Sequence, residues 1–317
     1  MKFKQTSLYQ RLKEIYKTIN NYYRFNFCGS IVFFVIKRTK IKSSYVESKF
    51  CSINNNQKSL FLITVAFNDE ILIQNQIERI KEYLKDDNYC HIIVDNSSVT
   101  AKRKAIATVC DKQNITYIPV PKIISCCISK ISGGVSHGTA MNWAYYNIIH
   151  VMKPDYFGFI DHNLFPVENY RVMHKLQGQN MYGSLRNRMK GWYIWAGFCF
   201  YRYEYIKDIQ MNFLPKVFHG EYFDTGGANY SLLYKDQDLN KLLFTSDTTL
   251  RIQNSNTNIY QYNQIYHNDC IQIIDDNWIH IVHASCIKDK VLQKNKIEKV
   301  LTNYKKMFFA YQCRKDS

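Results

Sequence analysis

Proline and glycine are scarce in this sequence, which has only 5 and 12 of them among its 317 residues. This scarcity excludes a collagen-like fibre and a flexible linker protein. Apolar residues make up 46% of the chain and aromatic residues 15%, a composition typical of a packed globular enzyme. A chain of this length can bury a large core, so we expect one α/β unit with extensions.

Cysteine pairs and long apolar runs are also missing. The 10 cysteines include no Cys-x-x-Cys pair, and no secretory signal is recognisable. We therefore expect a reducing, cytoplasmic environment rather than a disulfide framework. A membrane span needs roughly 18 consecutive apolar residues, and the longest N-terminal run, Ile31–Ile36, is far shorter. We expect that the chain does not cross a bilayer by itself.

Positive charge is concentrated at the N-terminus. The formal net charge is +16, and residues 1–50 contain eleven Lys or Arg against two Glu. Between residues 5 and 24, apolar residues recur at helical spacing with basic residues between them, which predicts a basic amphipathic helix. Such a helix either lies peripherally on an anionic membrane surface or packs on the main domain with its lysines in water. Residues 1–57 are interpreted as this arm and a linker.

From residue 58 onward, apolar runs of strand length alternate with helical patterns. Strands are predicted at 60–66, 91–94, 115–120 and 156–160, and helices at 69–84, 101–111 and 138–150. This order predicts an α/β fold with a mostly parallel, Rossmann-like sheet flanked by helices, whose ligands bind beyond the carboxyl ends of the strands. Residues 169–317 are less regular and predict a mixed extension with a late strand at 278–282 and a C-terminal helix.

Polar residues follow three of the predicted strands. These corners are Asn68-Asp69, Asp95-Asn96 and Asp161-His162-Asn163. Each of them could simply cap the next helix, since Asp and Asn favour that position. On one shared edge of a sheet, however, their oxygens could accept hydrogen bonds from a nucleobase and ribose, and the oxygen pair at the fourth strand could hold a cation.

These segments resemble the family 2 glycosyltransferases of GT-A fold. The resemblance extends over residues 60–170 and rests on Thr64–Asp69, Ile92–Ser98, Ser132–Asn142 and Phe159–Asn163. It implies that residues 58–168 bind a nucleotide-diphosphate sugar and that residues 169–317 bind the acceptor, a glycan or a lipid-linked molecule. The donor-binding residues that it implies are Ala66, Asn68, Asp95, Asn96, Gly134, His137, Asn142 and Asp161.

The resemblance also implies a divalent cation, Mn²⁺ or Mg²⁺. Asp161 and Asn163 stand where the family has its Asp-x-Asp metal motif. Asparagine brings no charge, so the site would be weaker or would need a further ligand. His280, on the late strand, is the best further ligand, with a buried structural histidine as the alternative. His283 lies three residues on and should face the opposite side of an extended strand, so only one of the two should point into the site.

Inverting sugar transfer needs a base near the acceptor hydroxyl. Asp224 is our first candidate and Glu221 our second, because both lie beside the glycine turn Gly226-Gly227. The family usually has two adjacent acids at this position, and Asp224 could instead cap the next helix. Trp192 and Trp195 are predicted to stack on acceptor sugar rings, with core packing as the alternative.

Two other classes of function compete with this one. A Rossmann-type methyltransferase needs a glycine-rich turn directly after the first strand, and Ala66–Glu70 contains no glycine. A non-catalytic basic protein would bind a membrane or nucleic acid through the N-terminal arm. The sequence has no recognisable nucleic-acid-binding motif, so no nucleic-acid partner is expected.

Overall fold

The computed structural model describes residues 13–50, 59–122, 132–251 and 270–315, together with residue 124, with residues 14, 15 and 18 excepted. The predicted linker up to residue 57 and the first part of the predicted amphipathic helix, residues 5–12, lie outside this set. Among the described helices, none is both long and apolar enough to cross a membrane.

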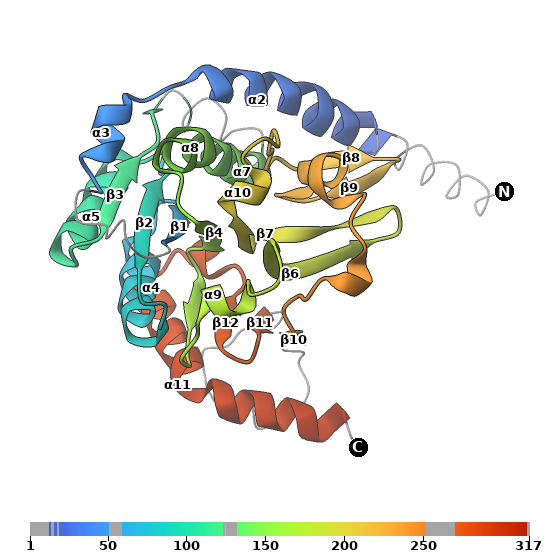
Figure 1. Ribbon diagram of the computed structural model, residues 1–317. Helices are drawn as coiled ribbons and strands as arrows, with labels where there is room; N and C mark the ends of the chain where they lie inside the picture. Colours follow the sequence, from blue (N-terminus) through green and yellow to red (C-terminus); the bar gives the residue numbers. More distant parts are fainter. Residues whose placement is uncertain are drawn as a thin grey trace.

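A six-stranded sheet forms the centre of the molecule, with strand order β3-β2-β1-β4-β7-β6 (Figure 1). Its first four strands are parallel, β7 runs antiparallel to β4, and β6 runs antiparallel to β7. The strands are β1 (Leu60–Ala66), β2 (Tyr89–Asp95), β3 (Thr116–Pro119), β4 (Tyr156–Asp161), β6 (Met181–Arg188) and β7 (Gly191–Arg202). This sheet confirms the predicted fold class and is consistent with a GT-A fold. Because β6 and β7 pair with β4, the two predicted parts share one sheet.

Helices cover both faces of the sheet. The alternation of side chains along β1 shows why: Phe61, Ile63 and Val65 join the core cluster of α2 and α7, whereas Leu60 and Leu62 join that of α4. Figure 1 shows α2, α7 and α8 on one side and α4 and α11 on the other. The main helices are α2 (Gly29–Arg38), α4 (Glu70–Tyr83), α5 (Thr100–Lys112), α7 (Gly133–Ala144), α8 (His150–Met152) and α11 (Lys290–Lys315).

The helix α7 begins at Gly133 rather than at the predicted residue 138. The reason is an N-cap, because the Ser132 hydroxyl accepts a hydrogen bond from the Val135 N–H at 3.1 Å. Gly133 and Gly134 are therefore the first residues of the helix. Their lack of a side chain, rather than their flexibility, matters at the site.

A second, antiparallel sheet and several short elements complete the fold. The sheet has the order β10-β11-β12-β5 and places the predicted late strand beside the end of β4. Its strands are β5 (Leu164–Pro166), β10 (Asp247–Arg251), β11 (Cys270–Ile274) and β12 (Trp278–Ile281). The hairpin strands are β8 (Lys216–Phe218) and β9 (Glu221–Phe223). Short helical segments are η1 (Tyr23–Cys28), α3 (Ser43–Glu47), η2 (Tyr145–Ile149), α9 (Val172–Lys175), α10 (Tyr203–Ile206), η3 (Gly227–Asn229), η4 (Tyr230–Tyr234), η5 (Leu239–Lys241) and η7 (Ala284–Cys286).

Gln76, a fully buried residue of α4, holds the turn after β4. Its Oε1 accepts a hydrogen bond from the Thr64 hydroxyl at 2.7 Å, and its Nε2 donates to the carbonyl oxygens of Asp161 and Leu164 at 2.6 and 2.7 Å. These hydrogen bonds hold the backbone of the polar corner Asp161-His162-Asn163 in place. Sequence reasoning missed this residue, although a glutamine between the apolar helix positions 73, 77 and 80 was a signal.

Replacing Gln76 with methionine should lower the free energy of unfolding by about 2–4 kcal/mol, because two buried carbonyl groups lose their donor. Gln74→Met is the matched control on the exposed face of the same helix, and it should stay within about 0.5 kcal/mol of the parent. Urea denaturation measures both. Equal stabilities of the two variants would show that the turn does not depend on Gln76.

Candidate active site

A cavity of about 560 Å³ opens at the carboxyl ends of β1, β2 and β4. Its wall combines the ends of these strands with the start of α7 and with residues of the second half of the chain. The lining residues are Val65, Phe67, Asn96, Gly133, Ser136, His137, Asp161, His162, Asn163, Trp195, Asp224, His280, Val282, His283 and Ser285. Two of the three predicted polar corners therefore contribute to one cavity.

Asn96 presents an unsatisfied acceptor on this wall. Its Nδ2 donates to the backbone oxygen and the hydroxyl of Ser136 at 3.2 and 2.9 Å. The carbonyl oxygen can only accept, which fixes the orientation of the amide. Oδ1 is then buried without a hydrogen-bond partner among the described residues, and the residue is only 2% exposed. Leaving such an acceptor unpaired costs about 1–3 kcal/mol.

Asp161 and His137 lie next to each other in the wall of the cavity. Asp161 is the last residue of β4, and His137 lies in the second turn of α7. The distance between His137 Nε2 and Asp161 Oδ1 is 3.4 Å, and about a quarter of each side chain is exposed, 24% and 23%. Both groups are thus held by rigid elements and remain accessible to a ligand.

His280 is oriented by its neighbour on β11, since Gln272 pairs with it in the sheet register. The Gln272 amide donates to Asp247 Oδ2 at 3.1 Å, and its Oε1 accepts from Arg186 Nη2 at 3.2 Å. His280 Nδ1 lies 3.3 Å from the same Oε1, so Nδ1 carries the proton and Nε2 keeps its lone pair. Burial lowers the pKa of His280 to about 4, which leaves the ring neutral at pH 7.

The expectation that only one of His280 and His283 points into the site is wrong. The strand β12 ends at Ile281, and His283 adopts a left-handed conformation with φ of 61°. The alternation of an extended strand therefore does not reach His283, and both histidines line the cavity.

Trp195 forms an aromatic wall of the cavity, and Trp192 does not. The Trp195 ring lies 4.8 Å from the His280 ring, and the Arg186 guanidinium lies 5.0 Å from the indole centroid. A Cβ at Gly197 would come within 2.2 Å of the indole, so only glycine allows this placement. Trp192 is 6% exposed and packs in the core, where its nearest ring neighbour lies at 5.0 Å.

The two candidate bases have different surroundings. Asp224 lines the cavity, and its Oδ1 accepts from the Tyr222 hydroxyl at 3.0 Å and the Thr225 N–H at 2.8 Å. Oδ2 is therefore the oxygen left for a ligand. Glu221 accepts from the N–H groups of residues 189 and 190, at 3.1 and 2.9 Å, in the turn between β6 and β7. It is not among the lining residues.

Asp95, one of the predicted donor-binding residues, is fully buried beside the cavity rather than in its wall. Its Oδ1 accepts from the Ser97 N–H at 2.8 Å and its Oδ2 from the Tyr117 hydroxyl at 2.7 Å. Both carboxylate oxygens thus stabilise the end of β2. Burial, together with the charge of Asp95 and its hydrogen bond, raises the pKa of Tyr117.

Three other predicted donor-binding residues likewise support the wall. Asn142 is fully buried, and its Oδ1 accepts from the Phe213 N–H at 2.8 Å. Asn68 adopts a positive φ of 52° and accepts from the N–H of residue 99 at 3.1 Å, which ties the ends of β1 and β2 together. Ala66 is buried in β1.

Sequence reasoning missed several lining residues, among them Phe67, Ser136, His162 and Ser285. His162 lies inside the third polar corner, so its position was a signal. Its Nδ1–H donates a hydrogen bond to the Val65 carbonyl oxygen at 3.1 Å, and desolvation lowers the pKa of the ring.

The described residues do not form a metal centre on their own. Among them, no group of three His, Cys, Asp or Glu is placed to hold an ion. The described lining residues include two carboxylates and four histidines but no Lys or Arg. Mg²⁺ usually needs only one or two carboxylates when substrate phosphates supply other ligands. Asp161 meets that requirement, so the wall fits a cation that arrives with a phosphorylated ligand.

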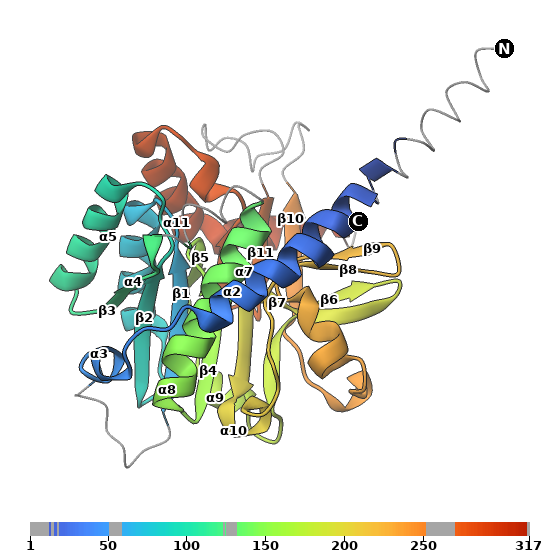
Figure 2. The same ribbon diagram turned by 90° about the horizontal axis from the view of Figure 1, so that it is seen from above.

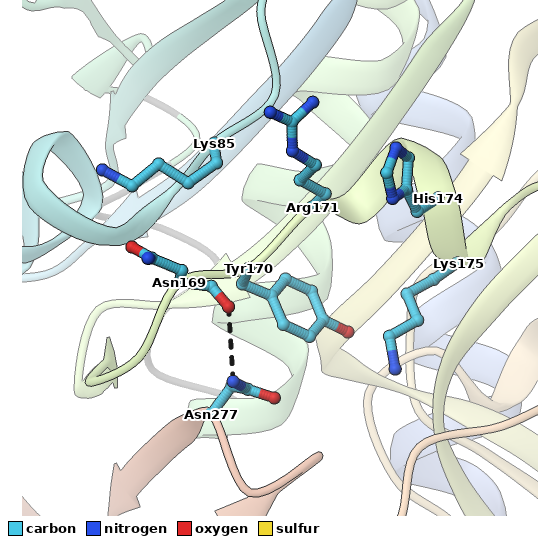
Figure 3. Close-up of a pocket in the computed structure, with 7 residues that line it drawn as sticks. All are labelled: Lys85, Asn169, Tyr170, Arg171, His174, Lys175 and Asn277. Atoms are coloured by element: carbon cyan, nitrogen blue, oxygen red, sulfur yellow. Dashed lines mark hydrogen bonds between the residues drawn. The ribbon is translucent and has the colours of Figure 1, made fainter.

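A second cavity, of about 570 Å³, lies near the start of β2 (Figure 3). Figure 3 shows Arg171, His174 and Lys175 on one segment around the Tyr170 ring. Two of these cations already face carboxylates, with Arg171 3.7 Å from Asp87 and Lys175 3.4 Å from Asp275. The cavity is remote from the carboxyl ends of the parallel strands, where ligands of such sheets bind.

No family model and no curated protein sequence matches this chain. Several solved structures are similar to part of this chain. The bifunctional glycosyltransferase WbbM in its apo form has a TM-score of 0.34 and 8% identity, over 48% of this chain and 33% of that one. The galactosyltransferase LgtC, in complex with donor and acceptor sugar analogs, has a TM-score of 0.32 and 14% identity, over 45% and 57%. S. aureus TarS has a TM-score of 0.32 and 11% identity, over 49% and 30%. The chain thus spans about a third to just over half of the length of these proteins.

The absence of a side chain at Gly134 lets the start of α7 pack closely against Asp224 and Thr225. A Cβ at this position would lie 2.9 Å from Asp224 Oδ1 and 3.2 Å from the Thr225 hydroxyl, whereas a Cβ at Gly133 would meet nothing within 4 Å. Gly134→Ala should therefore lower the free energy of unfolding by about 1–3 kcal/mol through overpacking. Gly133→Ala, the matched control, should not lower it. Calorimetric melting of both variants is the measurement, and equal melting temperatures would contradict this contact.

Proposed function

We propose that the cavity binds a nucleotide-diphosphate sugar and that the chain transfers the sugar to a glycan or a lipid-linked acceptor. The observation that carries the proposal is the shared cavity: the ends of three parallel strands meet Asp224 and Trp195 from the second half in one space. Ligands of open α/β sheets bind at this edge. The resemblance of the four motifs to GT-A glycosyltransferases supports the same reading.

On the donor side, the residues offer contacts to each part of such a ligand. The unpaired Oδ1 of Asn96 accepts a hydrogen bond from the base or ribose. The first turn of α7, at Gly133, opens on the cavity, and the N-terminus of a helix favours phosphate groups. Asp161 and His137 line the same cavity, and the diphosphate would lie beside them.

The charge of the cavity supports cation assistance. A diphosphate beside the carboxylates of Asp161 and Asp224 is repelled unless a positive charge accompanies it. When bound, Mn²⁺ or Mg²⁺ would neutralise the leaving diphosphate. The ligands we propose are the Asp161 carboxylate, the Asn163 side-chain oxygen and His280 Nε2. Asn163 Nδ2 donates to the Ile281 carbonyl at 3.0 Å, which leaves its oxygen for this role.

On the acceptor side, Asp224 acts as the base in this proposal. Its Oδ2 takes the proton of the acceptor hydroxyl while the oxygen attacks the anomeric carbon of the donor. The new C–O bond forms as the bond to the diphosphate breaks, and the nucleoside diphosphate leaves with inversion at that carbon. The indole face of Trp195 packs on the sugar ring.

A screen of nucleotide sugars for thermal stabilisation tests the donor site. One of them should raise the melting temperature of the wild type in the presence of MnCl₂, because a ligand that binds the folded state shifts unfolding by mass action. Asp161→Asn should lose the part of this shift that depends on manganese. Gln74→Met, which lies on an exposed surface, should keep all of it. No stabilisation by any nucleotide sugar would remove the donor-site proposal.

Turnover tests the base. Asp224→Asn should lower kcat by about 100- to 10,000-fold, the range for loss of a general base, while donor-induced stabilisation stays unchanged. Glu221→Gln is the matched control, since this carboxylate is engaged in the β6–β7 turn, and it should leave kcat nearly unchanged. The result that contradicts the assignment is a larger loss in Glu221→Gln than in Asp224→Asn.

A further inference from the structure

The N-terminal helical segment carries an apolar stripe on its solvent side. Residues 19–38 are helical without interruption, through η1 into α2. Tyr22 and Val35 are exposed there, and five further exposed apolar side chains recur three or four positions apart, with exposed fractions between 52% and 64%. We call these residues the aromatic stripe: Ile19, Tyr23, Phe27, Ile31 and Phe34. A spacing of three or four residues keeps them on one face of the helix.

The opposite face attaches the helix to the domain. Phe25, Val32 and Ile36 are buried there. The side chain of Asn26 pairs with the backbone of Val217, donating to its carbonyl and accepting from its N–H, both at 2.9 Å. Figures 1 and 2 show α2 on the outer side of α7. These contacts attach the helix to the core of the domain without any contribution from the aromatic stripe.

Basic side chains accompany the stripe. The Arg38 guanidinium lies 3.4 Å from the centroid of the Phe34 ring, and Lys49 Nζ lies 5.4 Å from that of Tyr45. Residues 19–50 contain six Lys or Arg and one acidic residue, Glu47. A helix with apolar and aromatic residues on one face and Lys or Arg beside them is typical of the interface of an anionic bilayer.

We propose that the aromatic stripe docks on an anionic lipid bilayer. The bilayer is the occupant that uses both features, since acyl chains take up the apolar side chains and acidic headgroups pair with the flanking cations. The stripe covers fifteen residue steps, about 22 Å at 1.5 Å per residue, so the helix lies along the surface. This orientation agrees with its attachment to the domain along its other face.

The docked helix also contacts the acceptor side of the cavity. The Phe25 ring lies 4.8 Å from the Tyr222 ring, and the Tyr222 hydroxyl donates to Asp224. Resting on the proposed function, this contact favours a lipid-linked acceptor over a soluble glycan, because the membrane-bound helix and the proposed base belong to one packed unit.

Vesicle co-sedimentation of the full chain tests the docking without any nucleotide sugar. The wild type should bind vesicles of phosphatidylglycerol and phosphatidylcholine in equal parts. Replacing Phe27, Ile31 and Phe34 with serine should weaken this binding by about 100-fold or more. Replacing Arg38, Lys42 and Lys49 with glutamine should weaken it by about 100-fold and reduce the preference over phosphatidylcholine alone.

The matched control replaces three exposed apolar residues elsewhere, Val99, Leu243 and Val291, with serine. It should bind vesicles as the wild type does. Unchanged binding by the stripe variant, or equal binding to both kinds of vesicle by the wild type, would overturn the proposal. The proposal would also be overturned if sedimentation showed that the wild type is a dimer and the stripe variant is not, since a second copy would then cover the face. Donor stabilisation, measured without vesicles, reports on the proposed function separately.

Discussion

The parallel register of β1 with its two neighbours is the constraint on which the site depends. Val65 pairs with Asp161, and Ala66 pairs with Asp95, so the three strands end at one level. Residues that follow these strands are therefore brought together although they are far apart in the sequence. Gln76 adds the second requirement, since it fixes the turn after β4 from the helix below. The cavity is a consequence of this shared edge.

Within this edge, hydrogen bonding divides the polar residues into two groups. Asp95 and Asn142 make their hydrogen bonds inside the protein and stabilise the strand and helix ends. Asn96 keeps a buried acceptor without a partner among the described residues, and Asp161 keeps an accessible carboxylate. Buried polar atoms are normally satisfied, so Asn96 is an exception in the wall of the cavity.

The four parallel strands, the helices between them and the sheet edge could be predicted from the sequence, because local periodicity and capping residues indicate them. Which corner residues face the cavity could not be predicted. Hydrogen bonds to Phe213 and Gln272 orient the side chains of Asn142 and His280. These partners belong to other elements of the fold, and such contacts leave no local pattern in the sequence. The position of His283 was mispredicted because its left-handed backbone ends the strand geometry early.

The protonation of the histidines limits how an anion can bind. Burial lowers the pKa of His280 to about 4, and desolvation also lowers that of His162, so neither ring brings positive charge at pH 7. Asp161 and Asp224 meanwhile bring negative charge to the same wall. Under the proposed function, a diphosphate that entered alone would meet repulsion, and the described lining residues include no Lys or Arg to offset it. In that proposal, the donor would have to carry its counter-charge with it, and a neutral His280 would be able to ligate a cation rather than compete with one.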